Sequence, residues 1–339
     1  MQFERLHEIL EKIKRVRIAV YGDFCLDAYW FLDPKGGEIS AETGLHSRAV
    51  RTHYYRLGGG SNVVANVAAL APAQVQVIGV IGNDIFGREV MRQMQEIGVD
   101  ISSLFIQEQD FHTVTFSKII LENKEQPRID FGFFNARTEK TDQLILQRLR
   151  QAMESMDALI FNQQVPGSLA RDLFINGVNQ LLDEFHDKIV LLDSRHYGRR
   201  FKNIVRKTNE VEAACLAGKE SHVLDQIPLD ETKIHARQLF AESGKPVFVT
   251  RGHHGILVVD RDGLHDAPGV KISGPLDTVG AGDTVVSALG LCLAAGVSPA
   301  EAAEFANLAA GVTVQKLFMT GTATGEEIME VWGKAHSTF

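Results

Sequence analysis

Short strands that alternate with helices constrain the fold of this chain more than any other feature of its sequence. Beyond residue 138 a helical stretch is followed by a strand-like segment, and the pattern then repeats. The expected elements are, in order, helix 144–156, strand 158–161, helix 169–185, strand 189–192, and strands 247–250 and 255–259 joined by a tight loop. This alternation predicts an α/β fold with a mainly parallel, doubly wound sheet covered by helices.

The N-terminal half adds elements of the same kind and two segments of different character. The expected elements are an amphipathic helix with apolar positions from Phe3 to Ile13, strand 16–21, helix 63–70, strand 75–81 and helix 86–97. Residues 33–57 and 108–135 instead contain polar, alternating segments typical of exposed strands. We interpret them as insertions that form a small β lid. Since no internal repeat or linker divides the chain, we expect residues 1–339 to form a single domain.

Composition excludes several classes of function. A net charge of −8 argues against a surface that binds nucleic acid or an anionic membrane. The three cysteines, Cys25, Cys215 and Cys292, lie far apart in the sequence, so neither a zinc site nor a disulfide framework is indicated. The N-terminus is charged and has no apolar signal core. We therefore expect a cytoplasmic protein.

The most informative local motif is Gly280-Ala281-Gly282-Asp283, which precedes the apolar run 285–297. That run is too short to cross a bilayer and predicts a buried helix. The small residues would lie at the helix N-terminus, where unpaired backbone N–H groups and the helix dipole attract anions. Asp283 beside such a phosphate cradle could accept a hydroxyl proton. Alternatively, Asp283 is an ordinary helix cap and the glycines form an ordinary turn.

The motif from Asp277 to Asp283 resembles the C-terminal signature of the PfkB (ribokinase-like) carbohydrate kinases. The resemblance implies a ribokinase-like, three-layer α/β/α fold and ATP-dependent phosphorylation of a carbohydrate hydroxyl. It also implies that the amides of Gly280, Ala281 and Gly282 form the anion hole and that Asp283 is the catalytic base. The cofactors implied are ATP and Mg²⁺, and a requirement for a monovalent cation such as K⁺ stays open.

A second glycine cluster, Gly58-Gly59-Gly60-Ser61-Asn62, resembles the N-terminal signature of the same family. It is not a dinucleotide fingerprint, because Val63 stands where that motif needs glycine. The resemblance implies that Gly58, Gly59 and Asn62 contact sugar hydroxyls, as does Asp27 after the first strand. A helix-opening turn capped by Ser61 or Asn62 is the structural alternative. Asp23 is a weaker candidate for the sugar site, since it could simply cap the next segment.

Three further motifs resemble the nucleotide side of the family's site. Asn209 and Glu212 fit its Asn-x-x-Glu, which implies a place near the phosphates for Asn209 and a water-mediated contact to Mg²⁺ for Glu212. Their structural alternative is a solvated helix face. Thr250, Gly252 and Gly255 fit its nucleotide loop, which we favour over a metal site built from the adjacent histidines. Asn307 falls where the family contacts adenine. We interpret Asp84 in a fourth motif, Gly82–Gly87, as a helix cap.

Within the family, the chain is most similar to the heptose-7-phosphate kinase domain of ADP-heptose synthase. Matching segments are 22–30, 39–42, 128–131 and 311–317. The chain departs from that branch at 161–167, at Asp193-Ser194-Arg195 and in an insertion at 318–320. Because these segments are expected to contact substrate, we assign Asn162 and Arg195 to the sugar site, where Arg195 could clamp a phosphate.

These features together predict a sugar or sugar-phosphate kinase whose lids pair into a homodimer, since exposed sheet edges favour pairing. Another sugar or a nucleoside could be the substrate. A catalytically silent sugar- or nucleotide-binding regulator is the main alternative, although a pure binder needs no base such as Asp283. A dinucleotide-dependent oxidoreductase is disfavoured by the failed glycine spacing.

Overall fold

The computed structural model describes residues 1–166, 172–317 and 319–336. Its centre is a nine-stranded sheet with the strand order β14-β13-β12-β11-β10-β9-β1-β4-β5. The strands are β1 (Arg17–Gly22), β4 (Gln74–Gly82), β5 (Asp100–Gln107), β9 (Ala158–Gln163), β10 (Ile189–Ser194), β11 (Val205–Asn209), β12 (Val247–Thr250), β13 (Ile256–Asp260) and β14 (Gly263–Ala267). Neighbours from β5 to β12 run parallel, and β13 and β14 continue the sheet antiparallel. The predicted mainly parallel sheet is confirmed.

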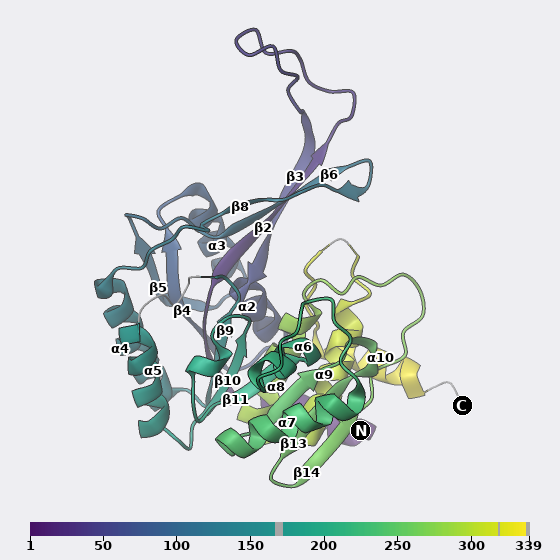
Figure 1. Cartoon of the computed structure of the whole chain (residues 1–339). Coiled ribbons are helices and arrows are strands. Elements are labelled where there is room, and N and C mark those ends of the chain that lie inside the picture. The colour runs from purple at the N-terminus through teal and green to yellow at the C-terminus, as the bar shows by residue number, and fades with distance from the viewer. Residues whose placement is uncertain (167–171, 318, 337–339) are drawn as a thin grey trace.

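Helices cover both faces of this sheet (Figure 1). One side carries α1 (Phe3–Ile13), α2 (Gly60–Ala69), α3 (Ile85–Glu96), α8 (Ala281–Ala294), α9 (Pro299–Thr313) and α10 (Gly325–His336). The other carries α4 (Glu139–Ser155), α5 (Asp172–Glu184), α6 (Glu210–Leu216) and α7 (Leu229–Ser243). Two short 3₁₀ turns, η1 (Gly198–Arg200) and η2 (Gly252–His254), lie in loops. The three-layer α/β/α arrangement is therefore confirmed.

The strand period of two divides the core between these layers. In β1, Ile18 and Val20 belong to the apolar cluster beneath α2, α8 and α9, whereas Ala19 and Tyr21 belong to the cluster beneath α4 and α5. A strand buried on both faces has no polar alternation, which is why such strands appear in the sequence as continuous apolar runs. The same burial explains why α8, predicted at 285–297, has no polar face.

A second, small sheet stands away from the body of the molecule (Figure 1). It has the order β3-β2-β6-β7, with β8 also paired to β6. Its strands are β2 (Phe24–Leu32), β3 (Val50–Gly59), β6 (Thr115–Leu121), β7 (Lys124–Glu125) and β8 (Ile129–Phe131). The two predicted insertions therefore do meet in one sheet.

The small sheet also begins earlier than the predicted boundary at residue 33. β2 crosses from the body into the small sheet, and its first six residues are buried, so it lacks the alternation used to find exposed strands. The structure also adds β5, α7, β14 and α10, for which the sequence analysis made no prediction. β11 spans Val205–Asn209 and so ends at the asparagine of the Asn-x-x-Glu motif. The predicted start of helix 169–185 and the Phe318 part of the insertion lie outside the described residues.

Within the described ranges, no helix combines the length and the apolar composition needed to cross a membrane.

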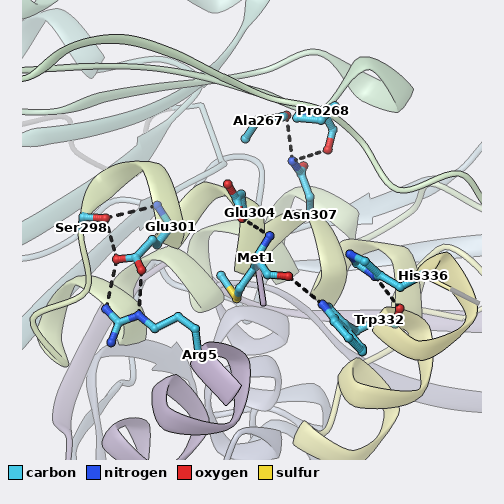
Figure 2. Close-up of polar contacts among 10 residues, drawn as sticks. All are labelled: Met1, Arg5, Ala267, Pro268, Ser298, Glu301, Glu304, Asn307, Trp332 and His336. Atoms are coloured by element: carbon cyan, nitrogen blue, oxygen red, sulfur yellow. Dashed lines mark hydrogen bonds and ion pairs between the residues drawn. The ribbon is translucent and has the colours of Figure 1, made fainter. Parts of the chain in front are cut away.

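Polar contacts fasten the N-terminal segment to α9 and α10 (Figure 2). The Arg5 guanidinium donates two hydrogen bonds to the Glu301 carboxylate, at 2.7 and 3.1 Å. The amine of Met1 pairs with Glu304 at 2.7 Å, and the Trp332 indole donates to the Met1 carbonyl. The hydrogen bonds from Arg5 lower the pKa of Glu301 from 4.5 to about 2.

We expect Glu301→Gln to lower the free energy of unfolding by about 1 kcal/mol at pH 7, because it removes a bidentate ion pair that is only partly shielded from water. A carboxylate with a depressed folded-state pKa stabilises the fold above its unfolded pKa and loses that effect as pH falls through the folded pKa. The difference from wild type should therefore shrink as pH drops from about 4.5 towards 2. Urea titrations across this range measure it, and a pH-independent difference would contradict the ion-pair explanation.

Candidate active site

The carboxyl ends of four neighbouring strands define the edge of the sheet where the predicted site lies. β1, β9, β10 and β11 run parallel, so their last residues emerge on the same side. In open α/β sheets this edge is where ligands bind. The N-termini of α2 and α8, which hold the two glycine clusters, meet at this edge through side-chain contacts.

The N-terminus of α8 begins in the conformation that its glycines permit. Gly280 is the N-cap residue with φ of 80°, in the left-handed region that favours glycine. Its carbonyl accepts the amide of Thr284 at 3.0 Å. The amide of Ala281 donates to the Thr278 carbonyl at 3.2 Å, so it would have to exchange that partner to bind an anion. The turn thus has the helix-start geometry that an anion hole requires.

Asp283 lies in the first turn of α8 and is held by a residue from the other glycine cluster. Asn62 Nδ2 donates to Asp283 Oδ2 at 2.8 Å, across 221 residues of sequence. Burial raises the pKa of Asp283 from 3.8 to about 7, although the bond from Asn62 and the charge of Lys207 oppose this change. A carboxylate with a pKa near neutrality is suited to general-base catalysis.

A buried amide network fixes Asn62 in turn. Asn66 Nδ2 donates to the Asn62 carbonyl at 2.9 Å and to Asn62 Oδ1 at 3.2 Å. Thr284 Oγ1 donates to Asn66 Oδ1 at 2.8 Å. Because each side chain is held from two elements, α2 and α8 are locked together at their N-termini.

The sugar side of the predicted site contains an ion pair that the sequence analysis missed. Asp27 Oδ2 accepts a hydrogen bond from Lys118 Nζ at 2.9 Å, and the same ammonium also donates to Tyr29 OH at 2.9 Å. Burial raises the pKa of Asp27, while Lys118 acts to lower it. A Cβ on Gly58 would lie only 2.8 Å from Asp27 Oδ1, so glycine lets this carboxylate pack against β3. Gly59 has φ of 51°, and a Cβ there would lie 2.9 Å from Cys25 Sγ.

Asn162 and Arg195, the other predicted sugar contacts, lie in contrasting surroundings. Asn162 is fully buried, and its amide donates to Asp193 Oδ2 at a long 3.4 Å. Its Oδ1 has no hydrogen-bond partner among the described residues. Arg195 is exposed, and its charge acts on the carboxylate of Glu212.

Asp84 makes the capping contact predicted for it, whereas the amides that Asp23 Oδ2 accepts belong to the chain after β9 and not to the segment that follows Asp23. Asp23 Oδ2 accepts the amides of Gln164 and Val165, both at 2.8 Å. Asp84 is the N-cap of α3 and accepts the amide of Gly87 at 2.7 Å. The structural interpretation of Asp84 is confirmed.

On the nucleotide side, Asn209 and Glu212 form a reciprocal capping box at the start of α6. Asn209 Oδ1 accepts the Glu212 amide at 2.8 Å, and Glu212 Oε2 accepts the Asn209 amide at 2.9 Å. Burial raises the pKa of Glu212, and Lys207 opposes the change. Both residues therefore have a structural role at the position where the family motif places them.

The loop after β12 and Asn307 complete the set of predicted residues. Thr250 Oγ1 donates to the Thr208 carbonyl, which ties this loop to β11. Gly252 and Gly255 have φ of 55° and 93°. The side-chain amide of Asn307 donates to the carbonyls of Ala267 and Pro268 at 2.9 and 3.1 Å (Figure 2). Asn307 thus fixes the chain after β14, and none of these contacts joins it to the other predicted residues.

A second missed pair lies beneath the anion-hole turn. Lys207 of β11 contacts both oxygens of Asp193 at the end of β10, at 3.2 and 3.3 Å. Lys207 belongs to none of the glycine or Asn-x-x-Glu signatures, so no motif indicated it. The signal available was a lysine inside a strand that is otherwise buried, two residues before Asn209.

Comparison with known proteins agrees with this arrangement. Residues 17–324 match the model of the pfkB family carbohydrate kinases. The chain belongs to this family. It is thus an ATP-dependent carbohydrate kinase by family membership, and its binding of ATP follows from the same assignment.

Curated relatives share about 30% identity with this chain. The bifunctional protein HldE of Coxiella burnetii (strain Dugway 5J108-111) is 30% identical over 327 residues, covering 92% of this chain and 62% of the relative. HldE of Shewanella denitrificans is 31% identical over 330 residues, with coverages of 94% and 63%. The chain therefore spans less than two thirds of the length of these relatives.

Solved structures share the fold at lower identity. Arabidopsis thaliana ribokinase complexed with ribose and ATP superposes with a TM-score of 0.70 at 17% identity, covering 94% of this chain and 98% of that one. Escherichia coli phosphofructokinase-2 in complex with potassium gives 0.71 at 19% identity, with coverages of 94% and 99%. These structures support the ribokinase-like fold.

Proposed function

We propose that the protein transfers the γ-phosphoryl group of ATP to a hydroxyl of a sugar phosphate at the α2–α8 junction, with Asp283 as the base. The observation that carries this proposal is Asp283 itself, whose burial brings its pKa to about 7 at the first turn of α8. Asn62 orients the carboxylate, and the amides of Gly280, Ala281 and Gly282 stabilise charge on the transferring group. Asp27, Gly58, Gly59, Asn162 and Arg195 bind the acceptor.

The cofactor side of the proposal uses the remaining predicted residues. ATP lies over the loop with Thr250, Gly252 and Gly255, near Asn209, while Asn307 supports that side through the chain after β14. Glu212 acts on Mg²⁺ through water, which suits an ion that keeps several waters and uses few protein carboxylates. Bound Mg²⁺ would neutralise phosphate charge.

The charge of the small sheet favours a phosphorylated substrate over a neutral sugar. Three cations in or beside this sheet lie over aromatic rings, namely Lys118 over Tyr29, Arg128 over Phe116 and Arg56 over Tyr54. Lys118 also pairs with Asp27 and Arg128 with Asp130, so the exposed Arg56 is the best placed of the three to meet a phosphate. Stacking leaves the donor edge of a guanidinium available for phosphate. Heptose 7-phosphate, suggested by the HldE relatives, is therefore the first substrate to test. In this proposal the small sheet closes as a lid and excludes water.

We expect Asp283→Asn to lower turnover by about 10² to 10⁴-fold, because the amide cannot accept the hydroxyl proton. ADP release with Mg·ATP would be measured across sugars, sugar phosphates and nucleosides. Asp230→Asn is the matched control, since that carboxylate is 91% exposed on α7. Near-normal turnover of Asp283→Asn would reject the base assignment. Wild-type silence across the panel, with ATP still bound, would favour a sugar- or nucleotide-binding regulator.

The pH dependence should report the same carboxylate. Asp283 accepts a proton only when ionised, so kcat/KM should fall tenfold per pH unit below about 7, the pKa that burial gives it. Stopped assays from pH 5 to 9 with the best substrate of the panel would measure this limb. A profile that stays flat down to pH 5 would exclude Asp283 as the titrating base.

The assembly and location of the enzyme extend this proposal. The chain forms one kinase domain in the cytoplasm and dimerises through its small sheets. Support comes from apolar side chains in the segment 33–49, which joins β2 to β3. In this segment Ile39 and Leu45 are 68% and 71% exposed. Light scattering should give twice the chain mass, and Ile39→Asp with Leu45→Asp should shift it towards one chain. A wild-type monomer at micromolar concentration would contradict the dimer.

A further inference from the structure

Lys207 is a buried cation that the proposed mechanism has not used. Lys207 belongs to β11, and its side chain is 8% exposed. It lies near the carboxyl end of that strand, beneath the start of α8. Burying an ammonium is costly unless it is paired and hydrogen-bonded. Its contacts with Asp193, at 3.2 and 3.3 Å, are longer than the 2.7–2.9 Å that is typical of strong charge-assisted bonds. Asp193 therefore holds Lys207 loosely, without using the full capacity of its three donors.

The ammonium faces the start of α8. A Cβ added to Gly282 would lie 3.3 Å from Lys207 Nζ, and apart from the flanking residues and the backbone of α8 no other atom of the described residues comes within 4 Å of this position. Glycine at 282 thus leaves the space between the ammonium and the helix start open. The N-terminus of a helix carries partial positive charge, which disfavours a neighbouring ammonium. A ligand anion placed between them would be attracted by both.

The surrounding groups keep Lys207 charged. Burial acts to lower the pKa of Lys207, but the carboxylates of Asp193, Glu212 and Asp283 outweigh it, and the net direction is upward. A second polar group also lacks a partner here, because the Oδ1 atom of fully buried Asn162 accepts no hydrogen bond among the described residues. Asn162 shares Asp193 with Lys207. The carboxyl edge of the sheet is therefore polar here, with a positive charge on Lys207 and an acceptor of Asn162 that lacks a partner among the described residues.

We propose that Lys207 is a further catalytic residue, whose ammonium contacts the phosphoryl group while it passes from ATP to the acceptor. This inference rests on the phosphoryl transfer proposed above. In that step the bond from the γ-phosphorus to the β–γ bridging oxygen breaks and ADP leaves. A bond from phosphorus to the acceptor oxygen forms, and the hydroxyl proton goes to Asp283. Lys207 stays protonated throughout, and Asp193 is its positioning residue.

The alternative is a purely structural ion pair, and the two roles predict different results. Removing one partner of a buried ion pair leaves the other charge uncompensated and destabilises the fold. If Lys207 only supports the sheet, Lys207→Met should change stability but not the chemical step. If it contacts the phosphoryl group, the loss should appear in kcat, because that interaction strengthens in the transition state.

We expect Lys207→Met to lower kcat by about 10² to 10³-fold, with the KM for the acceptor changed only a few-fold. Lys207→Arg keeps the charge but displaces it, so its kcat should lie between those of Lys207→Met and the wild type. The matched control is Lys188→Met, since Lys188 is a partly buried lysine that bonds to the Met156 carbonyl at the opposite edge of the sheet. Its kcat should stay within about twofold of wild type, the effect of a change outside the site.

A binding measurement separates the contact from folding effects. Aluminium fluoride with ADP mimics the transferring phosphoryl group, and such mimics bind tightest where the transition state is stabilised. Aluminium fluoride should tighten the binding of ADP to the wild type and to Lys188→Met. In Lys207→Met this tightening should be smaller by at least about tenfold. The affinity of Lys207→Met for ADP alone should stay normal. If Lys207→Met does not fold, reduced tightening in Lys207→Arg carries the same conclusion.

The outcomes distinguish the two proposals. A wild-type enzyme that phosphorylates no member of the panel would overturn the proposed function itself. An active wild type, with unchanged kcat and unchanged tightening in folded Lys207→Met, would overturn only the role of Lys207.

Discussion

The hydrogen bond from Asn62 to Asp283 joins the two glycine turns on which the site depends. Each turn opens a helix, and each helix packs on the same face of the central sheet. Neither turn alone combines an oriented carboxylate with a place for an acceptor. Because Thr284 and Ser287 of α8 also donate hydrogen bonds to α2, a shift of α2 relative to α8 would break several hydrogen bonds at once. These bonds between α2 and α8 therefore fix the position of the Asp283 carboxylate.

Each buried carboxylate near this junction has a neighbouring donor that partly compensates its negative charge. Asp27 is matched by Lys118 from the small sheet, and Asp193 by Lys207 from the neighbouring strand. Asp283 has an amide partner instead of a full cation, so burial prevails and raises its pKa. An ion pair acts to lower the pKa of its carboxylate, as Lys118 does for Asp27, although burial prevails there as well. Asp283 differs from Asp27 in that its hydrogen-bond partner, the Asn62 amide, is uncharged.

The sequence predicted the parts of this site that depend on local backbone geometry. Glycines at 280 and 59 adopt positive φ, and such positions can be recognised without knowing the rest of the fold. Lys207 and Lys118 could not be found in that way. Their partners lie 14 and 91 residues away, and only strand pairing brings them together. β2 was missed for a related reason, because its buried first half lacks the alternation that reveals an exposed strand.

A structural role of Glu212 as a helix cap is compatible with the role proposed for it near Mg²⁺. Asn209 and Glu212 cap α6 through their own backbone, so the carboxylate of Glu212 is anchored by one oxygen before any ion arrives. An anchored carboxylate would lose little side-chain entropy if it ordered water around Mg²⁺, as proposed for Glu212. Asn307 shows the opposite case, because its amide nitrogen already serves two carbonyls near β14 and cannot readily be released to a base. A direct contact from Asn307 to a nucleotide would therefore use its Oδ1 as the acceptor, while its amide nitrogen fixes the position of that chain segment.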